Sequence, residues 1–266
     1  MISHYCETQI NYLNGAEIQP VSVTVSNARD ADTTWEHEGY QRLDHRSAVK
    51  SWRDADEVAA CYYTEMAAVA QRLTGCDQAI VVGHILRDPG QAELHEDYAP
   101  IQFAHSDFAE TYGDALRNRY AEGRESEREA LERAGASIDD VVNATDLMVL
   151  QFWRNVGPTD MDLPLAFCDA TSTTRDDMLA FNVPSYAGTA DPFDTLGMHS
   201  AAASKHRWSV FPALQDSEVI TFRTFDSRRV GTDQPFWTPH SAFADPVVAN
   251  PQPRASIEVR ATCLFR

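Results

Sequence analysis

Three residues with metal-ligating side chains, His105, Asp107 and His240, carry the clearest chemical signal in the sequence. His105 and Asp107 are two positions apart, and in an extended strand such residues point to the same face, so both can hold one metal ion. With His240 as the third ligand they would form a 2-His-1-carboxylate facial triad, which covers one face of Fe(II) and leaves the opposite positions open for a co-substrate and O₂. The pattern therefore predicts oxygenase chemistry, with these three residues as metal ligands and catalytic residues.

A second pair, Arg254 and Ser256, follows His240 and again occupies alternate positions of an expected strand. A guanidinium fork presents parallel N–H donors to a carboxylate, and a hydroxyl on the same face adds another donor. This pair would suit the distal carboxylate of 2-oxoglutarate as co-substrate. Arg260 is the alternative anchor, because a regular strand would place it on the same face. Glu258 would share that face too, and either a Glu258–Arg260 pair or a β-bulge would accommodate it.

The composition favours one large soluble domain over residues 1–266. The chain has 266 residues with 43% hydrophobic content, enough for a sizeable core. Its formal charge of −18 repels phosphate backbones and anionic membranes, so we expect a small-molecule substrate and neither nucleic acid nor membrane as partner. A homodimer is compatible with the sequence.

The cysteines and the N-terminal sequence indicate the cellular compartment. The five cysteines are scattered without C-x-x-C spacing, which argues against a thiolate zinc site or a redox motif. We find no basic-then-apolar signal at the N-terminus and no apolar run near the roughly 18 residues of a membrane span. These features predict a reducing cytoplasm.

Hydrophobic periodicity predicts mainly strands with flanking helices. One helix should run from Asp54 or Asp56 to a stop at Gly75, and a second helix-prone segment covers 108–134, within an insertion of about 108–140. Strands are expected at 21–25, 79–86, 147–153, 164–168, 207–211, 218–225 and 255–264. Short strands between turns indicate a sandwich or jelly roll, and the stretch from about 170 to 204 is expected to be a long active-site loop.

The order of motifs along nearly the whole chain resembles one enzyme family. The motifs are Trp35 to Tyr40, Thr74 to Cys76, Phe103 to Asp107, Trp153-Arg154, Pro164 to Asp169, Phe225 to Ser227, Pro239 to Phe243 and Arg254 to Arg260. They are similar to those of the Fe(II)/2-oxoglutarate-dependent dioxygenases of the hydroxylase/desaturase family of secondary metabolism. That family includes AsaB-like enzymes, gibberellin desaturase relatives, the small subunit of the cephalosporin 7α-methoxylase and aziridine-forming oxygenases.

The resemblance implies a double-stranded β-helix, a cupin-like jelly roll, that uses Fe(II), 2-oxoglutarate and O₂ to hydroxylate, desaturate or cyclise a small secondary-metabolite or amino-acid-derived substrate. It also implies decarboxylation of 2-oxoglutarate to succinate. The ligand roles fall on His105, Asp107 and His240, and the anchor role on Arg254 with Ser256. Related halogenases lack the carboxylate ligand, so the intact Asp107 disfavours halogenation.

The sequence departs from the family pattern where Asn-x-Trp-Arg-Pro is usual, because Gln151 to Asn155 occupy that place and Ala255 replaces a Glu. Trp153 and Arg154 are candidate substrate-binding residues, although Arg154 could instead form a structural ion pair with Asp169. Two alternatives to the enzyme stay open: a non-catalytic small-molecule-binding or partner subunit of an oxygenase pair, and an iron enzyme that does not use 2-oxoglutarate.

Overall fold

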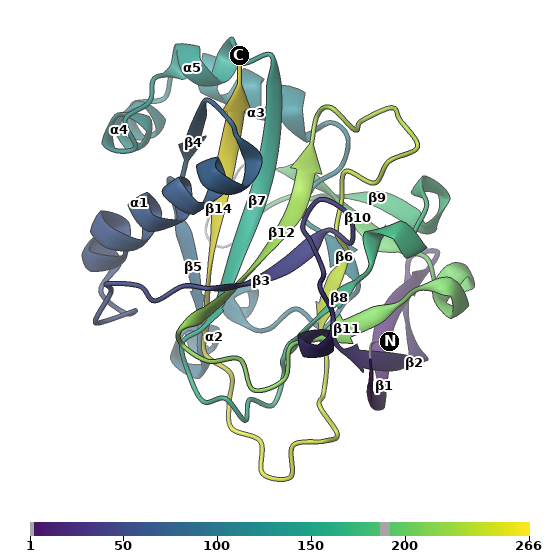
Figure 1. Ribbon diagram of the computed structural model, residues 1–266. Helices are drawn as coiled ribbons and strands as arrows, with labels where there is room; N and C mark the ends of the chain where they lie inside the picture. The colour runs from purple at the N-terminus through teal and green to yellow at the C-terminus, as the bar shows by residue number, and fades with distance from the viewer. Residues whose placement is uncertain (1–2, 187–191) are drawn as a thin grey trace.

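Two sheets build the framework of the computed structural model, which describes residues 3–186 and 192–266 (Figure 1). The first has the order β1 (Ser3–Asn14), β2 (Glu17–Asn27), β11 (Trp208–Val210), β8 (Leu165–Cys168), β13 (His240–Ala242), β6 (His105–Ser106), β10 (Phe193–Met198) and β9 (Met178–Val183). The second has the order β3 (Tyr40–Asp44), β12 (Glu218–Asp226), β7 (Asp146–Asn155), β14 (Ser256–Phe265) and β4 (Gln78–Ile80), and β5 (His84–Arg87) also pairs with β14.

Aromatic side chains from both sheets meet in the core between them. Phe167 of β8 packs edge-on against Phe222 of β12, with ring centroids 5.0 Å apart, and Phe222 lies 4.8 Å from the ring of His240 on β13. All three side chains are buried. The strands alternate inward and outward residues, so the inner faces of the two sheets supply one shared core. This arrangement is the double-stranded β-helix predicted from the sequence.

Helix α1 (Ala55–Thr74) covers the outer face of the second sheet and contacts β14 and β4 (Figure 1). It begins where the Asp54 side chain accepts hydrogen bonds from the backbone N–H groups of Asp56 and Glu57. It ends at Gly75, whose left-handed backbone (φ 67°) suits a residue without a side chain. The predicted helix and both of its boundaries are confirmed.

The segment predicted to be helix-prone, 108–134, contains α3 (Tyr112–Ala121) and α4 (Glu125–Arg133), and α5 (Ile138–Val142) follows it. Gly123 separates the first two with a left-handed φ of 69°. Short helices complete the chain: α2 (Pro89–Leu94) and the 3₁₀ turns at Ala28–Asp30, Glu96–Tyr98, Ala170–Ser172, Arg175–Asp177 and Ser200–Lys205.

The strand expected at 79–86 is interrupted. From Ile80 to His84 this strand advances four positions, while its partner β14 advances three, from Thr262 to Val259. The extra residue forms a bulge that divides the expected strand into β4 and β5. Val82, in the interruption, is 41% exposed.

The segment expected to be a loop, 170–204, instead contains the antiparallel pair β9 and β10, with Met178 opposite Met198 and Val183 opposite Phe193. Residues 187–191 of that prediction lie outside the described residues. β10 continues the first sheet by pairing with β6, where Gly197 lies opposite His105. The segment 170–204 therefore pairs directly with β6, the strand that carries the predicted metal ligand His105.

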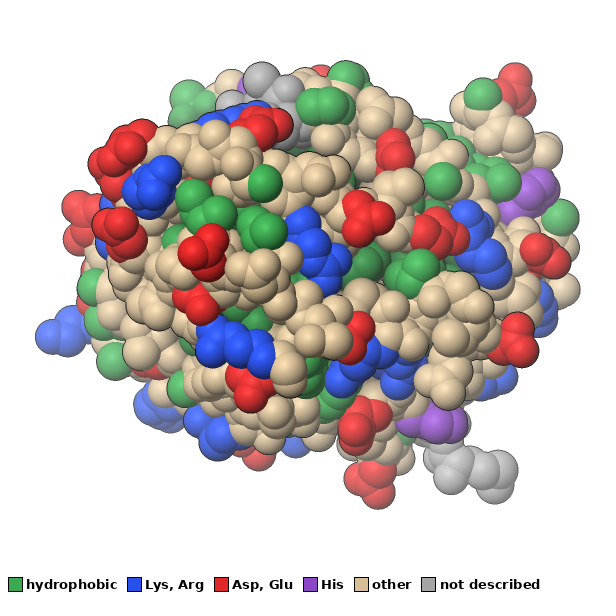
Figure 2. Space-filling view, turned by 90° about the horizontal axis from the view of Figure 1, so that it is seen from above, with side chains coloured by type: hydrophobic (Ala, Val, Ile, Leu, Met, Phe, Trp, Pro, Cys, Tyr) green, Lys and Arg blue, Asp and Glu red, His purple; other side chains and the backbone are tan. Residues whose placement is uncertain are grey.

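Acidic and basic side chains are interspersed on the face drawn in Figure 2, with apolar side chains visible between them. On this face the excess of acidic residues is thus spread over the surface. Within the described residues, no helix is both long and apolar enough to cross a membrane.

Candidate metal centre and its cavity

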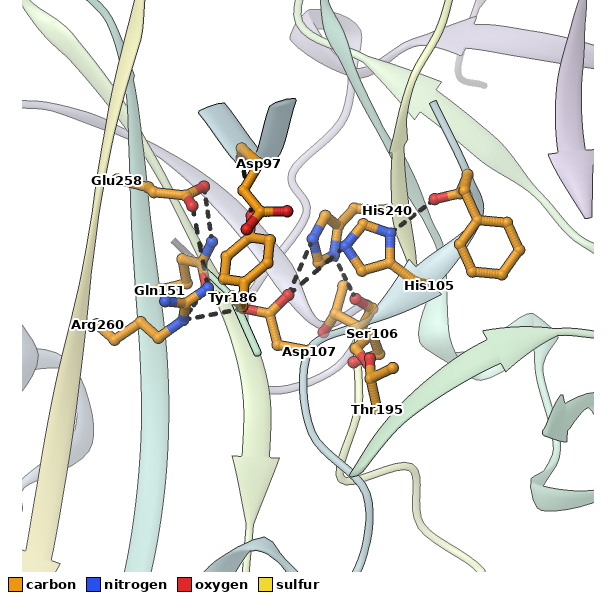
Figure 3. A network of polar contacts seen from close by, with 12 residues as sticks. Asp97, His105, Ser106, Asp107, Gln151, Tyr186, Thr195, His240, Glu258 and Arg260 are labelled. Atoms are coloured by element: carbon orange, nitrogen blue, oxygen red, sulfur yellow. Dashed lines mark hydrogen bonds and ion pairs between the residues drawn. The ribbon is translucent and has the colours of Figure 1, made fainter. Parts of the chain in front are cut away.

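The three predicted ligands meet at one point of the first sheet (Figure 3). β6 and β13 pair so that His105 and His240 lie opposite each other, and Asp107 follows His105 by two residues on the same face. The Asp107 Oδ1 atom lies 3.7 Å from His105 Nε2 and 3.4 Å from His240 Nε2. One potential ligand atom from each residue lies within 4.8 Å of the others, and all three side chains are buried.

Hydrogen bonds to the backbone orient both imidazoles for metal binding. Nδ1 of His105 lies 2.6 Å from the carbonyl oxygen of Phe103, and Nδ1 of His240 lies 3.1 Å from that of Thr238. Because a carbonyl oxygen only accepts, each Nδ1 carries the hydrogen and each Nε2 keeps a lone pair that faces Asp107.

Electrostatics keep the ligand set in the form that binds a cation. Burial, and then the neighbouring His240, lower the pKa of His105 to about 4, which favours its neutral form. Burial opposes ionisation of Asp107, but the charge of Arg260 outweighs it and holds the pKa of this carboxyl below its usual range. Two imidazoles and one carboxylate are a donor set that fits Fe(II).

The predicted anchor pair lies in a buried position with free donors. Arg254 is 5% exposed, stacks over the Trp153 ring with its guanidinium carbon 5.6 Å from the centroid, and donates from Nη1 to the Leu163 carbonyl at 2.8 Å. Its Nε and the Ser256 hydroxyl are buried and have no hydrogen-bond partner among the described residues. Burial, and then the charge of Arg87, lower the pKa of Arg254 to about 9. A carboxylate bound in the cavity would give the Arg254 Nε an acceptor, whereas Ser256 is not among the cavity-lining residues.

Arg260 has a different environment from Arg254. It donates from Nε and Nη2 to Asp107 Oδ2 at 3.0 and 2.9 Å, and its Nε also reaches Gln151 Oε1 at 3.1 Å. The Glu258 carboxylate is held mainly by Arg87 of β5, at 3.0 Å, while Arg260 Nη2 lies 3.9 Å away. β14 is regular over Ser256–Phe265, so the pairing with Arg87 explains how Glu258 shares the inner face.

The metal site opens into a cavity of about 870 Å³. Its floor includes His105, Asp107 and His240, and Arg254 and Arg260 line the same space. The walls are largely aromatic and aliphatic, with Ile85, Ile101, Phe103, Phe108, Tyr112, Leu116, Trp153, Leu165, Phe181, Val183 and Phe193 among the lining residues. Such walls suit an apolar ligand held by a few polar groups.

Strand geometry places the two candidate substrate-binding residues on opposite faces of β7. Trp153 lines the cavity, and Arg154, the next residue on β7, points to the opposite face. Arg154 is fully buried there, donates to the Tyr62 hydroxyl at 3.2 Å and to the His45 carbonyl at 3.0 Å, and lies outside the cavity lining. Its position argues against substrate contact. Asp169, the ion-pair partner considered for it, pairs with Arg207 instead.

Sequence reasoning missed Arg87, Gln151 and Tyr186 as cavity residues. Arg87 lies in a turn-like Arg-Asp-Pro-Gly stretch that indicates only a change of direction. Gln151 could have been found, because it precedes Trp153 by two positions and must share its face. His84 is half-buried and also lines the cavity, and its Nδ1 lies 2.8 Å from the Tyr63 hydroxyl.

Similar proteins agree with this site and fold. The hydroxylase/desaturase CTB9 of Cercospora beticola is 26% identical over 92% of this chain and 76% of its own length. The alpha-ketoglutarate-dependent dioxygenase phiK of Fungal sp. strain ATCC 74256 is 25% identical over 92% of this chain and 84% of its own. A solved structure of the iron and alpha-ketoglutarate-dependent endoperoxidase NvfI matches 98% of each chain with a TM-score of 0.76 at 19% identity.

A double-stranded β-helix with a 2-His-1-carboxylate site defines the class of non-haem iron oxygenases, and the predicted resemblance to this class is confirmed by the relatives. Residues 4–264 match the family described as "Oxidoreductase/YMDC permease-like domain". The chain belongs to this family.

Proposed function

We propose that this protein is an Fe(II)/2-oxoglutarate-dependent oxygenase that hydroxylates, desaturates or cyclises a small secondary-metabolite or amino-acid-derived substrate. The observation that carries the proposal is the convergence of His105, Asp107 and His240 on the floor of a cavity that Arg254 also lines. The catalytic interpretation is favoured over a non-catalytic binding or partner subunit, because such a subunit has no need of a complete ligand set with oriented imidazoles.

In this proposal His105, Asp107 and His240 hold the iron. Fe(II), 2-oxoglutarate and O₂ held there would supply the oxidising chemistry of the class, with decarboxylation of 2-oxoglutarate to succinate and CO₂. The Phe103 and Thr238 carbonyls keep the two imidazoles in the tautomer that binds metal. The charge of Arg260 keeps Asp107 ionised and burial keeps His105 neutral, so neither ligand needs to lose a proton near neutral pH.

Arg254 and Ser256 are assigned to the distal carboxylate of 2-oxoglutarate. Their unpaired Nε and hydroxyl are two buried donors that lie two residues apart along the chain. The Trp153 ring fixes the Arg254 guanidinium from one side. Trp153 is therefore assigned a supporting role for the anchor as well as a place in the cavity wall.

The aromatic walls would position an apolar substrate and exclude water from the metal site. Which bond reacts depends on where the walls hold the substrate relative to the iron, so hydroxylation, desaturation and ring closure remain alternatives. Tyr112 of α3, in the predicted insertion of about 108–140, and Phe181 of β9, in the predicted loop of about 170–204, both line the cavity.

The first prediction tests this function by spectroscopy. Anaerobic addition of Fe(II) and 2-oxoglutarate to the purified protein is expected to give a weak visible charge-transfer band. His105→Ala and Asp107→Ala are expected to abolish the band, because each removes one of three ligands. His37→Ala is the matched control, since the His37 side chain is 73% exposed. A wild-type protein that binds neither component would refute the proposal.

We further propose that the chain acts in the cytoplasm as a single domain over residues 1–266 and that it forms a homodimer. The cavity is lined by residues from both halves of the chain, from Val82 to Thr262, which supports one catalytic unit. Multi-angle light scattering of the purified protein gives its mass directly, and a mass near that of one 29.7 kDa chain would exclude the dimer.

A further inference from the structure

The two oxygens of the Asp107 carboxylate have different partners (Figure 3). Oδ1 faces the Nε2 atoms of His105 and His240 at 3.7 and 3.4 Å. Oδ2 accepts two hydrogen bonds from Arg260, at 3.0 Å from Nε and 2.9 Å from Nη2. One oxygen is thus directed to the metal position, and the other is occupied by a guanidinium fork.

We propose that Arg260 is a positioning residue that holds Asp107 so that a single carboxylate oxygen faces the metal, and that it does not anchor 2-oxoglutarate. This inference rests on the proposed function and deepens it. A carboxylate that turned freely could offer both oxygens to one ion and occupy a further coordination position. The facial triad depends on open positions for the co-substrate and O₂, so a fixed orientation of Asp107 preserves them.

Further contacts fix Arg260 in turn. Gln151 of β7 accepts from Arg260 Nε at 3.1 Å and donates from its own Nε2 to Glu258 Oε2 at 3.1 Å. The other oxygen of Glu258 accepts from Arg87 at 3.0 Å. The guanidinium of Arg260 also lies over the Phe108 ring, 5.6 Å from its centroid. Gln151 of β7, Glu258 of β14 and the Phe108 ring therefore surround the Arg260 guanidinium, as expected of an outer-shell partner of a metal ligand.

The contrast with Arg254 supports a division of roles between the two arginines. The Arg254 Nε is buried and has no partner among the described residues, whereas the Arg260 Nε has two acceptors. Binding of 2-oxoglutarate by Arg260 would compete with Asp107 for the same donors. Binding by Arg254 satisfies a donor that is otherwise unpaired.

The second prediction concerns Arg260→Met and Arg260→Lys in the full-length protein, with Co(II) as the probe and no activity measurement. Met keeps an unbranched stem against Phe108 and removes the donors. Its Co(II) affinity by calorimetry is expected to fall about 10–100-fold, with a changed visible spectrum of the Co(II) protein. Lys keeps the charge without the fork, so we expect partial recovery of affinity. The affinity for 2-oxoglutarate at saturating Co(II) should fall together with the Co(II) affinity, because a released Asp107 carboxylate can occupy a position that the co-substrate needs.

Arg207 provides the matched control, because it donates from Nε and Nη2 to a single oxygen of Asp169 at 3.2 and 2.8 Å and lies outside the cavity lining. Arg207→Met should bind Co(II) like the wild type. If Arg260→Met does not fold, Arg260→Lys provides the measurement. Unchanged Co(II) affinity in the folded Arg260 variants would overturn the inference. So would a loss confined to 2-oxoglutarate affinity, whereas a wild type that binds no Co(II) would overturn the proposed function itself.

Discussion

At the scale of single residues, three arginines that line the cavity differ in the groups that they already contact. Arg87 and Arg260 each have a carboxylate partner within 3.0 Å, while Arg254 has none among the described residues. All three line the same cavity, so position alone does not distinguish them. Their unmet hydrogen-bonding capacity distinguishes them, because the buried Nε–H of Arg254 has no acceptor and this is costly until a ligand provides one.

The third prediction follows for Arg254. Arg254→Met is expected to weaken 2-oxoglutarate binding at saturating Co(II) by about 10-fold or more, since it removes a charge-assisted pair of about 1.5–3 kcal/mol. Co(II) affinity in the absence of 2-oxoglutarate should be unchanged, because Arg254 contacts none of the three ligands. Calorimetric titrations of each ligand separate the two effects. A variant that keeps wild-type 2-oxoglutarate affinity would remove Arg254 from the anchor role.

Residue-level prediction from the sequence succeeded where two-residue spacing sets a shared face. His105 and Asp107 followed from that spacing, and the ladder between β6 and β13 then brings His240 opposite His105. The same spacing could not distinguish Arg254 from Arg260. Their roles depend on Arg87 and Gln151, which come from other strands, and strand pairing between distant segments is not readable from one sequence.

At the scale of elements, the segments that lead into β3 and β13 meet at a contact that only glycine allows. Gly39 has a φ of 96°, and its carbonyl accepts a hydrogen bond from the Thr238 hydroxyl at 3.0 Å. A Cβ at this position would collide with the Thr238 side chain and lie 3.2 Å from Ala170 Cβ. Thr238 in turn supplies the carbonyl that orients His240, so this packing contact reaches the metal site.

The fourth prediction is that Gly39→Ala lowers the free energy of unfolding by about 1–3 kcal/mol through backbone strain and the collision with Thr238. It should also weaken Co(II) binding, because displacement of Thr238 moves the acceptor of His240. Gly15→Ala is the control: its φ is 63°, and a Cβ there would meet no described atom within 4 Å. Urea unfolding and Co(II) calorimetry measure both effects. Wild-type Co(II) affinity in Gly39→Ala would mean that the contact serves stability alone.

Helices and strands were predicted correctly where neighbouring residues in the sequence determine their ends. The prediction failed where pairing with a distant strand determines whether a strand forms. Asp54 and Gly75 bound α1 by capping chemistry that the sequence contains. The β9–β10 pair was missed because its strands are held by each other and by β6, and the buried and exposed residues of β9 do not alternate. The bulge between β4 and β5 likewise exists only relative to β14.

At the scale of the whole molecule, buried neutral histidines link stability to pH. His206, whose side chain has no exposed surface, stacks on Tyr12 of β1 with ring centroids 5.7 Å apart and an interplanar angle of 6°. Tyr12 also accepts a hydrogen bond from Trp208 of β11 at 2.7 Å, so the cluster joins two strands of the first sheet. Burial lowers the pKa of His206 below its ordinary value, although the nearby Asp177 opposes this shift.

The fifth prediction uses the sign of that shift. In the unfolded chain His206 takes up a proton as the pH falls through about 6.5, while in the folded protein it stays neutral to lower pH. The free energy of unfolding should therefore decline on acidification below pH 6.5, by at most about 1.4 kcal/mol per pH unit for this one group. Burial also lowers the pKa of His45, His84 and His105, which adds to the decline in the same direction.

Urea unfolding of the metal-free protein at several pH values measures the slope. His206→Gln should reduce it, the exposed His4→Gln should not, and an unchanged slope in His206→Gln would show that the Tyr12 cluster does not couple stability to pH.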